Sequence, residues 1–389
     1  MTSVVEVHGH VEPRFDAVRE AFATNFVRHG DVGAACAVYH RGRLVVDVWA
    51  GLAHREEARP WERDTLQLVF SSTKGMAATC ALQLVERGLI DLDAPIARYW
   101  PEFAAAGKAT IPVRWAFCHK AGLAAVDARL TLDEVLAWDP VVAAIAAQRP
   151  NWEPGTKHGY HARSYGWILG ELVRRVTGRT LGRFFADEIA APLGLEFWIG
   201  LPESEEPRVS TLIPAPEPEN PDVRAFLERQ MGPDTLLGRV LNGPSDLFRY
   251  DTRWNRRALH AAEMPSSNGI GTARAIARMY AALAGEVDGV RLLRPETIAL
   301  ARTVQSDGTD AVIGLPTRFG LGFMLPPILS PAAAPTAFGH PGAGGSLGFA
   351  DPEAELGFGY VMNQMALAVT VDPRSYRLVE AVYAALRRA

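Results

Sequence analysis

The segments with strand-like patterns lie at the two ends of this chain, and this distribution restricts its possible folds more than any other feature. After a predicted helix over residues 15–29, residues 34–48 alternate around an Arg41-Gly42-Arg43 turn, which is typical of a β-hairpin. The C-terminal part contains three further predicted strands and a closing amphipathic helix, at residues 319–325, 346–351, 356–363 and 374–388. Both ends of the chain therefore contribute to one predicted α/β domain.

The middle of the chain has a different pattern, mainly helical with Pro and Gly at the breaks. We expect a discontinuous α/β domain made of residues 1–92 and 265–389, with a mainly helical insert at residues 93–264. Within the insert, residues 202–222 are rich in proline and acidic side chains, which predicts a surface loop. The length of 389 residues and the 48% hydrophobic content suit such a globular arrangement.

Charge and targeting features point to a small-molecule substrate. The formal net charge of −4 gives no electrostatic reason to expect nucleic acid or an anionic membrane as a partner. The N-terminal residues lack the basic start and apolar core of a secretory signal, and no uncharged apolar run reaches the roughly 20 residues of a membrane helix. The three cysteines, Cys36, Cys80 and Cys118, are too widely spaced for a CxxC metal site, and they predict buried thiols in a reducing compartment. We expect a cytoplasmic protein, and its oligomeric state stays open.

One lysine lies in a pattern that can carry nucleophilic chemistry. Only four of the 40 basic residues are lysines, and one of them ends the segment Ser71-Ser72-Thr73-Lys74 at the start of a predicted helix over residues 71–87. Helical spacing places Ser71 and Lys74 on the same face, one turn apart. A buried lysine can lose its proton because desolvation disfavours the charged form, and it can then accept the serine proton. The alternative interpretation is a polar helix start followed by a surface lysine.

Three later segments raise the weight of the catalytic interpretation. They are His119-Lys120-Ala121-Gly122-Leu123, Gly159-Tyr160-His161-Ala162 and Gly339-His340-Pro341-Gly342. In this order and at these separations, the chain resembles the serine β-lactamase and penicillin-binding protein superfamily. Within it, the sequence is most similar to the family VIII carboxylesterases. The resemblance extends from about Phe15 to Arg387 and implies a class C β-lactamase-like fold, with an antiparallel sheet, flanking terminal helices and a mainly helical inserted domain.

The resemblance also implies roles for individual residues. Ser71 matches the nucleophile of the first motif and Lys74 its proton-accepting partner, while Tyr160 matches the tyrosine that shares protons with both. His340 and Gly342 occupy the third motif, which borders the substrate pocket. The family's oxyanion hole corresponds to the backbone N–H groups of Ser71 and Ala343. No cofactor is implied, and His119 matches a residue that supports the site structurally.

Two departures from the β-lactamase pattern favour ester substrates. The second motif has Ala162 where a polar amide is usual, and the third has His340 where a lysine usually binds the β-lactam carboxylate. Neither feature is needed for ester hydrolysis, because an ester is more reactive and its alcohol leaves readily. We expect a serine hydrolase that cleaves small carboxylic esters. A class C-type β-lactamase, a D-amino-acid peptidase and a non-catalytic penicillin-binding-like sensor are the alternatives.

A second serine matches an unrelated catalytic pattern. Gly344-Gly345-Ser346-Leu347-Gly348 fits the Gly-x-Ser-x-Gly elbow of α/β-hydrolases. That elbow needs a helix after the serine and a histidine later in the chain, whereas residues 347–363 have a strand pattern and His340 is the last histidine. We therefore expect Ser346 to be structural. No metal-binding pattern accompanies His158 and His161. The nine tryptophans include three near the second motif that are candidates for lining an acyl pocket, namely Trp152, Trp167 and Trp198, whereas we expect most of the nine to be ordinary core or interface residues.

Overall fold

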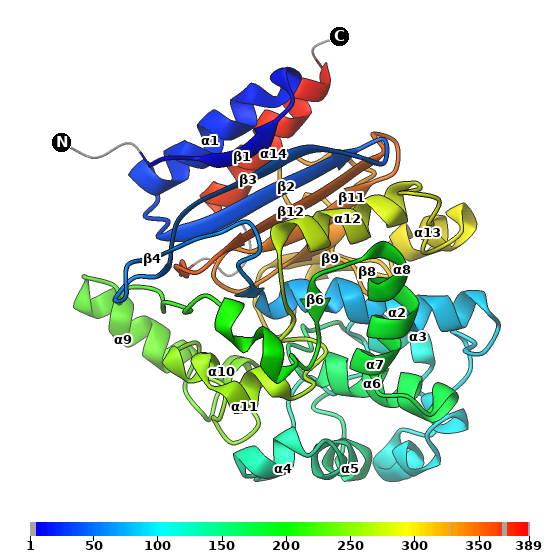
Figure 1. The fold of residues 1–389 in the computed structure, drawn as a ribbon. Helices are drawn as coiled ribbons and strands as arrows, with labels where there is room; N and C mark the ends of the chain where they lie inside the picture. Colours follow the sequence, from blue (N-terminus) through cyan, green and yellow to red (C-terminus); the bar gives the residue numbers. More distant parts are fainter. Residues whose placement is uncertain (1–4, 328, 368–371, 388–389) are drawn as a thin grey trace.

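One antiparallel sheet built from both ends of the chain organises the molecule (Figure 1). The computed structural model describes residues 5–327, 329–367 and 372–387. The strand order is β1-β3-β2-β12-β11-β10, and β4 pairs with the outer part of β3. The bounds are β1 His8–Val11, β2 Gly33–His40, β3 Arg43–His54, β4 Arg59–Pro60, β10 Phe338–Pro341, β11 Leu347–Asp351 and β12 Leu356–Met362. Because β2 pairs with β12 along its length, the predicted mixed α/β class with a sheet shared by both ends is confirmed.

The N-terminal hairpin turns at the predicted position. Arg41 and Gly42 both have positive φ, at +51° and +71°. Two consecutive left-handed residues give the type I′ geometry whose twist matches that of the flanking strands. The strand after the turn continues to His54, well past the predicted end at Val48.

Helices cover both faces of the sheet (Figure 1). The terminal helices α1, Asp16–Arg28, and α14, Pro373–Arg387, pack together on one face. Helix α12, Ala273–Ala284, packs on the opposite face against β2, β11 and β12. Two glycines of β12 allow this close contact, because a Cβ on Gly357 or Gly359 would lie 2.3 Å from backbone atoms of α12. The closing helix predicted over residues 374–388 is confirmed through Arg387, and Arg388 lies outside the described residues.

Most of the remaining helices form a layer below the sheet in Figure 1, whereas α13 lies beside one end of α12. Helix α2, Thr73–Glu86, packs against α6 and α7 of this layer. The others are α3 Val113–Phe117, α4 Leu132–Leu136, α5 Asp139–Ala147, α6 Ser164–Thr177, α7 Leu181–Phe185, α8 Ala191–Leu193, α9 Pro221–Gln230, α10 Leu236–Asn242, α11 Arg257–Ala261 and α13 Pro295–Arg302. The division of domains at residues 92/93 and 264/265 stays a prediction.

Two small sheets complete the fold. One has the order β5-β7-β6, with bounds Gln67–Leu68, Ile270–Gly271 and Phe197–Trp198, and the other pairs β8, Ser306–Thr309, with β9, Pro316–Phe319. The predicted strand over residues 319–325 is wrong. Only Phe319 and Met324 form bridges there, since the chain bends between them through Gly322, which has φ +84°. Across the described ranges, no helix has both the length and the apolar character needed to cross a membrane.

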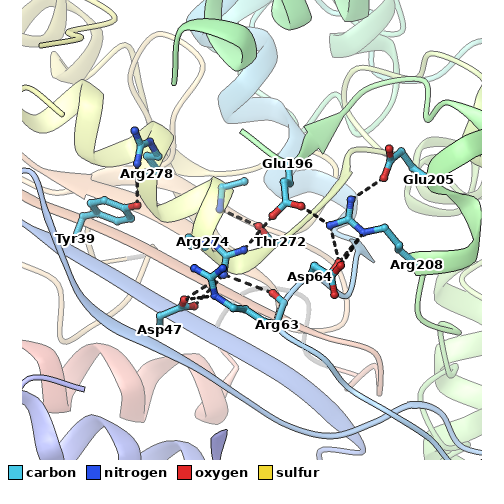
Figure 2. A network of polar contacts seen from close by, with 11 residues as sticks. Tyr39, Asp47, Arg63, Asp64, Glu196, Glu205, Arg208, Thr272, Arg274 and Arg278 are labelled. Atoms are coloured by element: carbon cyan, nitrogen blue, oxygen red, sulfur yellow. Dashed lines mark hydrogen bonds and ion pairs between the residues drawn. The ribbon is translucent and has the colours of Figure 1, made fainter. Parts of the chain in front are cut away.

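A network of ion pairs links the large sheet to the segment before β6 (Figure 2). Arg274, on α12, contacts Asp47 of β3 at 3.1 Å and Glu196 at 3.0 Å. Arg208 also pairs with Glu196 and contacts Glu205 at 2.6 Å. The Arg274 and Asp47 side chains are only 15% and 12% exposed. Solvent therefore screens their attraction less than it screens that of a fully exposed ion pair, which contributes roughly 0–1 kcal/mol to stability. This network joins elements that lie far apart in sequence.

Candidate active site

Ser71 lies at the entrance to a buried helix. Residues Phe70–Ser72 form a 3-10 turn that leads directly into α2, so the predicted helix start is confirmed with a tighter first turn. Phe70 has φ +43°, an unusual value for a bulky residue. Its ring packs edge-on against Tyr250 and Trp254, with centroids 5.1 and 5.0 Å away. This packing holds the strained turn, and it leaves Ser71 half-buried while Ser72 is fully buried.

Lys74 is completely buried and has three hydrogen-bonding partners. Its Nζ lies 3.0 Å from Ser71 Oγ, 2.7 Å from the carbonyl oxygen of Ala162 and 3.0 Å from that of Ser266. A neutral amine has two N–H donors and one lone pair. The two carbonyls can therefore accept both donors while the lone pair faces the Ser71 hydroxyl. Because an ammonium group would satisfy the same three partners, Lys74 can gain and lose a proton without moving.

The surroundings of Lys74 favour its neutral form. Burial lowers the pKa of Lys74 well below its usual value, and the positive charge of Arg163 lowers it further. No carboxylate pairs with Lys74 in the described part of the chain. Lys74 therefore has the electrostatic character of a proton acceptor.

Tyr160 lies on the loop that precedes α6 and completes a compact group around Ser71. Lys74 Nζ is 4.8 Å from the centroid of its ring, and Tyr160 and Ser71 line the same cavity. Burial raises the pKa of Tyr160, while the neighbouring Ser71 side chain and the charge of Arg163 act in the opposite direction. The hydroxyl therefore stays protonated at neutral pH, and it can donate a proton to an oxygen held next to Ser71.

A buried carboxylate that sequence reasoning missed fixes the Tyr160 loop. Asp310 Oδ1 accepts hydrogen bonds from the backbone N–H groups of Tyr160, Val312 and Ile313, at 3.0, 2.8 and 2.9 Å. Its Oδ2 accepts from Thr317 Oγ1 at 3.2 Å. Asp310 therefore connects the tyrosine to a loop 150 residues later. No motif in the sequence marked this residue.

A further histidine, His119, supports the site rather than entering it. The Nδ1 atom of His119 accepts a hydrogen bond from the backbone N–H of His161 at 3.1 Å, and its carbonyl accepts from Gly159 N–H at 3.1 Å. The His119 ring packs against Tyr160 at a centroid distance of 5.1 Å. Burial lowers the pKa of His119 well below its usual value, so this histidine is neutral. These contacts suit the supporting role expected for His119.

The third motif forms the opposite wall. His340, on β10, is buried and stacks over Tyr160 with ring centroids 6.0 Å apart. Its Nδ1 lies 2.7 Å from the Pro341 carbonyl, which makes Nδ1 the protonated nitrogen. Burial, with a smaller effect from Lys74, lowers the pKa of His340 to about 3. His340 therefore supplies no positive charge where a β-lactamase-like site has a lysine.

The turn after the third motif lies close to the turn that carries Ser71. Gly342 approaches the Ser71 turn so closely that a Cβ there would lie 2.2 Å from the Val69 carbonyl oxygen. The next residue, Ala343, lines the same cavity as Ser71. Among the described residues, the backbone N–H groups of Ser71 and Ala343 donate to no other protein group. Both are available to an oxygen bound in the cavity.

Ser346 is held by structural bonds. Its Oγ donates to the Val69 carbonyl at 2.9 Å and lies 3.0 Å from Ser72 Oγ. The residue is buried, and strand β11 begins directly after it, as predicted. Ser346 therefore has neither the exposure nor the following helix of a nucleophile elbow, and its bonds join the third-motif turn to the start of α2.

The site opens into an apolar cavity of about 230 Å³. In the described part of the chain its lining contains no Asp, Glu, Lys or Arg side chain and consists of Ser71, Tyr160, Ala215, Met231, Leu241, Tyr250, Ile313, Met324, His340, Pro341, Gly342, Ala343, Gly344, Met365, Ala366 and Leu367. The suggestion that tryptophans line the acyl pocket is wrong, because flexible Met, Leu and Ile side chains form the wall instead. A cavity of this kind suits an uncharged acyl group.

No group of three or more potential metal ligands exists in the part of the chain that the structure describes. His161 instead uses Nε2 to accept the N–H of Leu123 at 3.0 Å, and its Nδ1 contacts the Gly159 carbonyl at 2.6 Å. His158 Nε2 contacts Thr317 Oγ1 at 2.9 Å. Cys36, Cys80 and Cys118 are buried free thiols, as predicted.

Comparison with known proteins gives a consistent result. The family model described as Beta-lactamase matches residues 18–383. The Esterase/beta-lactamase LipL of Mycobacterium tuberculosis is 38% identical over 370 residues, which cover 92% of this chain and 83% of LipL. The crystal structure of a family VIII carboxylesterase superimposes with a TM-score of 0.89 at 41% identity, and covers 98% of this chain and 100% of that one. The crystal structure of a penicillin-binding protein homologue from Caulobacter crescentus superimposes with a TM-score of 0.87 at 38% identity, and the match covers 98% of this chain and 100% of that one.

Proposed function

The chain belongs to the beta-lactamase family, and we propose that within it this protein is a serine carboxylesterase that forms an acyl-enzyme on Ser71. The observation that carries the proposal is the position of Lys74, a buried amine hydrogen-bonded to Ser71 Oγ and to two carbonyls without any acidic partner. Such an amine can take the proton of the nucleophile at neutral pH. Ester hydrolysis is also supported by the names of LipL and of the carboxylesterase with the same fold.

In the acylation step, Ser71 Oγ attacks the carbonyl carbon of the ester while Lys74 accepts the hydroxyl proton. The carbonyl oxygen becomes negatively charged, and the N–H groups of Ser71 and Ala343 stabilise it. The bond from carbon to the alcohol oxygen then breaks. The Tyr160 hydroxyl donates its proton to that oxygen, and Lys74 returns a proton to Tyr160. The alcohol leaves, and the acyl group remains bonded to Ser71.

In the deacylation step, water replaces the alcohol and the same groups act in reverse. As the water oxygen attacks the acyl carbon, Lys74 accepts a proton, either directly from water or from Tyr160, which then takes the water proton in its place. Ser71 then leaves with a proton from the same pair, and the carboxylic acid is released. Lys74 keeps its three hydrogen-bonding partners throughout, which avoids reorganisation of the site between half-reactions. No metal or cofactor takes part in either step of the proposal.

The cavity and the third motif define the substrate class. With no charged side chain among the lining residues and His340 neutral, a substrate carboxylate finds no cation to replace its water shell. Small uncharged esters avoid this penalty. The same feature disfavours the alternatives of a β-lactamase or a D-amino-acid peptidase, although the Caulobacter homologue carries the penicillin-binding name. A cytoplasmic location and the absence of nucleic-acid and membrane partners stay predictions.

Parallel assays test the proposal. We expect purified protein to hydrolyse short-chain aryl esters with kcat/KM at least about a hundredfold above that for a chromogenic cephalosporin. Comparable turnover of the cephalosporin would overturn the esterase assignment. Ser71→Ala should abolish ester turnover, and mass spectrometry after phosphonate treatment should place the adduct on Ser71. Binding of the phosphonate without turnover of any ester would support the sensor alternative instead.

A further inference from the structure

A buried arginine lies three residues after Tyr160, at the start of the helix that follows it. Arg163 is only 4% exposed. Its Nη1 donates to Ser267 Oγ at 3.1 Å, and its Nη2 donates to the carbonyls of Leu241 and, at 2.8 Å, Phe248. Every partner of the guanidinium is neutral. No carboxylate forms an ion pair with it in residues 5–327, 329–367 or 372–387.

The rest of the guanidinium is surrounded by aromatic rings. Its central carbon lies 5.0 Å from the ring centroid of Phe248, 5.6 Å from that of Tyr250 and 5.1 Å from that of Trp254. Contact with ring faces stabilises a cation without neutralising its charge. Tyr250 also lines the substrate cavity, whereas Arg163 is not among the lining residues. Arg163 therefore acts on the site through its electric field and its neighbours, without touching the substrate.

The other groups that face Lys74 are uncharged. They come from five segments of the structure and comprise Ser71, His119, Tyr160, His161, Tyr165 and His340. Burial lowers the pKa of His161 to about 4 and that of His340 to about 3, and it raises the pKa of Tyr160 and Tyr165. Lys74 donates to the carbonyls of Ala162 and Ser266, and the residues that follow these two, Arg163 and Ser267, hydrogen-bond to each other. Lys74 and Arg163 are therefore neighbouring buried basic groups, with no counter-ion among the described residues that face them.

Two neighbouring positive charges in a low-dielectric interior repel each other strongly, and the weaker base is the one that gives up its proton. Lysine has an ordinary pKa of about 10.4 and arginine at least about 12.5, so the proton leaves Lys74. We propose that Arg163 is a positioning residue that keeps Lys74 in its proton-accepting form. This inference rests on the proposed function of Lys74.

The small number of lysines allows a direct test. We would label the lysines with ¹³C at Cε and follow their chemical shifts against pH by NMR, and assign Lys74 from a Lys74→Ala sample. Lys108 is an internal control, because it is also buried and donates to three carbonyls, but its pKa is lowered by burial alone. In the wild-type protein, Lys74 should titrate below Lys108. A Lys74 that titrates at or above Lys108 would overturn the proposal without any variant.

The Arg163→Met variant removes the charge. Because the repelling cation is gone, we expect the pKa of Lys74 to rise by on the order of one unit while that of Lys108 stays unchanged. The acidic limb of the pH profile of kcat/KM for an aryl ester should move to higher pH by the same amount. Relative to wild type, kcat/KM should therefore fall about tenfold at pH values below the limb and return to the wild-type value above it. Ser267→Ala is the matched control, since it removes a hydrogen bond of Arg163 and keeps the charge. Its acidic limb should stay in place.

A purely structural Arg163 would give a different result. Activity of Arg163→Met would then fall at every pH, with both the Lys74 titration and the acidic limb unmoved, and this result would refute the proposal. If Arg163→Met does not fold, the same measurements can be made on Arg163→Gln, whose side-chain amide can still donate to the Leu241 carbonyl. The proposed function fails separately, through a wild-type protein that hydrolyses no ester, whereas the lysine titration tests Arg163 without any turnover.

Discussion

Asp310→Ala should separate Tyr160 from the loop that holds it, and the structure sets the size of the effect. The substitution leaves three backbone N–H groups without their acceptor, those of Tyr160, Val312 and Ile313. A buried polar group that loses its partner costs about 1–3 kcal/mol. Water entering the space of the carboxylate will satisfy some of these donors, so we expect a loss of roughly 3–6 kcal/mol in the free energy of unfolding.

The catalytic effect follows from the position of Tyr160. A displacement of about 1 Å in a proton-transferring group can reduce the rate about a hundredfold. We expect kcat/KM for an aryl ester to fall by that order in the folded Asp310→Ala protein, measured at a temperature well below its unfolding midpoint. Asp310→Asn keeps an oxygen facing the three N–H groups and loses only charge assistance. It should therefore retain most of the stability and most of the activity.

A double-mutant cycle identifies the route of the effect. If Asp310 acts through Tyr160, then Asp310→Ala should add little to the activity loss of Tyr160→Phe, because both changes remove the same proton transfer. Urea unfolding of the same four proteins gives the stability terms. A folded Asp310→Ala enzyme with kcat/KM within about threefold of wild type would refute the positioning role. If the losses of kcat/KM in the two single variants multiply in the double variant, Asp310 acts on the reaction by a route that does not involve Tyr160.

Three further outcomes follow from the site. Lys74→Ala should lower kcat about a hundredfold or more with the fold intact. Lys74→Arg should not restore kcat, because arginine cannot accept the proton. Near-normal turnover of the arginine variant would show that only positive charge is needed at this position. Ser346→Ala should keep at least about a tenth of the ester turnover, since its hydroxyl makes structural bonds to Val69 and Ser72, and loss of all turnover would point to the elbow mechanism. For the wild type, kcat/KM should rise with pH as Lys74 loses its proton and should be unaffected by a chelator, and restoration by zinc after chelation would contradict the proposed mechanism.

Local sequence was enough to predict part of the fold and the Ser71–Lys74 contact. A helix places residues three apart on one face through its own backbone hydrogen bonds, so the contact needs no tertiary information. The hairpin around Arg41 and Gly42 and the strand after Ser346 were likewise predictable from residue pattern and turn chemistry. The bend at Gly322 was not, because the residues around it have the alternation of a strand and only their packing prevents one.

The roles of Tyr160, His340 and Ala343 came from resemblance to a family, because nothing near them in the sequence indicates proximity to Ser71. They remain predictions that the variants above can test. The structure shows how the third motif comes close to Ser71, because β10 lies beside the turn that carries Ser71. The tryptophans illustrate the opposite case. Their position near the second motif suggested a pocket wall, yet pocket lining depends on side-chain direction, which the sequence does not contain.

Sequence alone determined that Ser71 has a lysine one helical turn away, that the two chain ends share a sheet and that no lysine occupies the third motif. Tertiary structure decided the direction in which the pKa of that lysine shifts and the shape of the substrate cavity. The physical reason is that a pKa depends on every group packed around it. Lys74 shares its environment with Arg163 and with carbonyls 88 and 192 residues away, and Tyr160 depends on a carboxylate 150 residues later. Such long-range burial and charge leave no local pattern, so they became visible only in the folded chain.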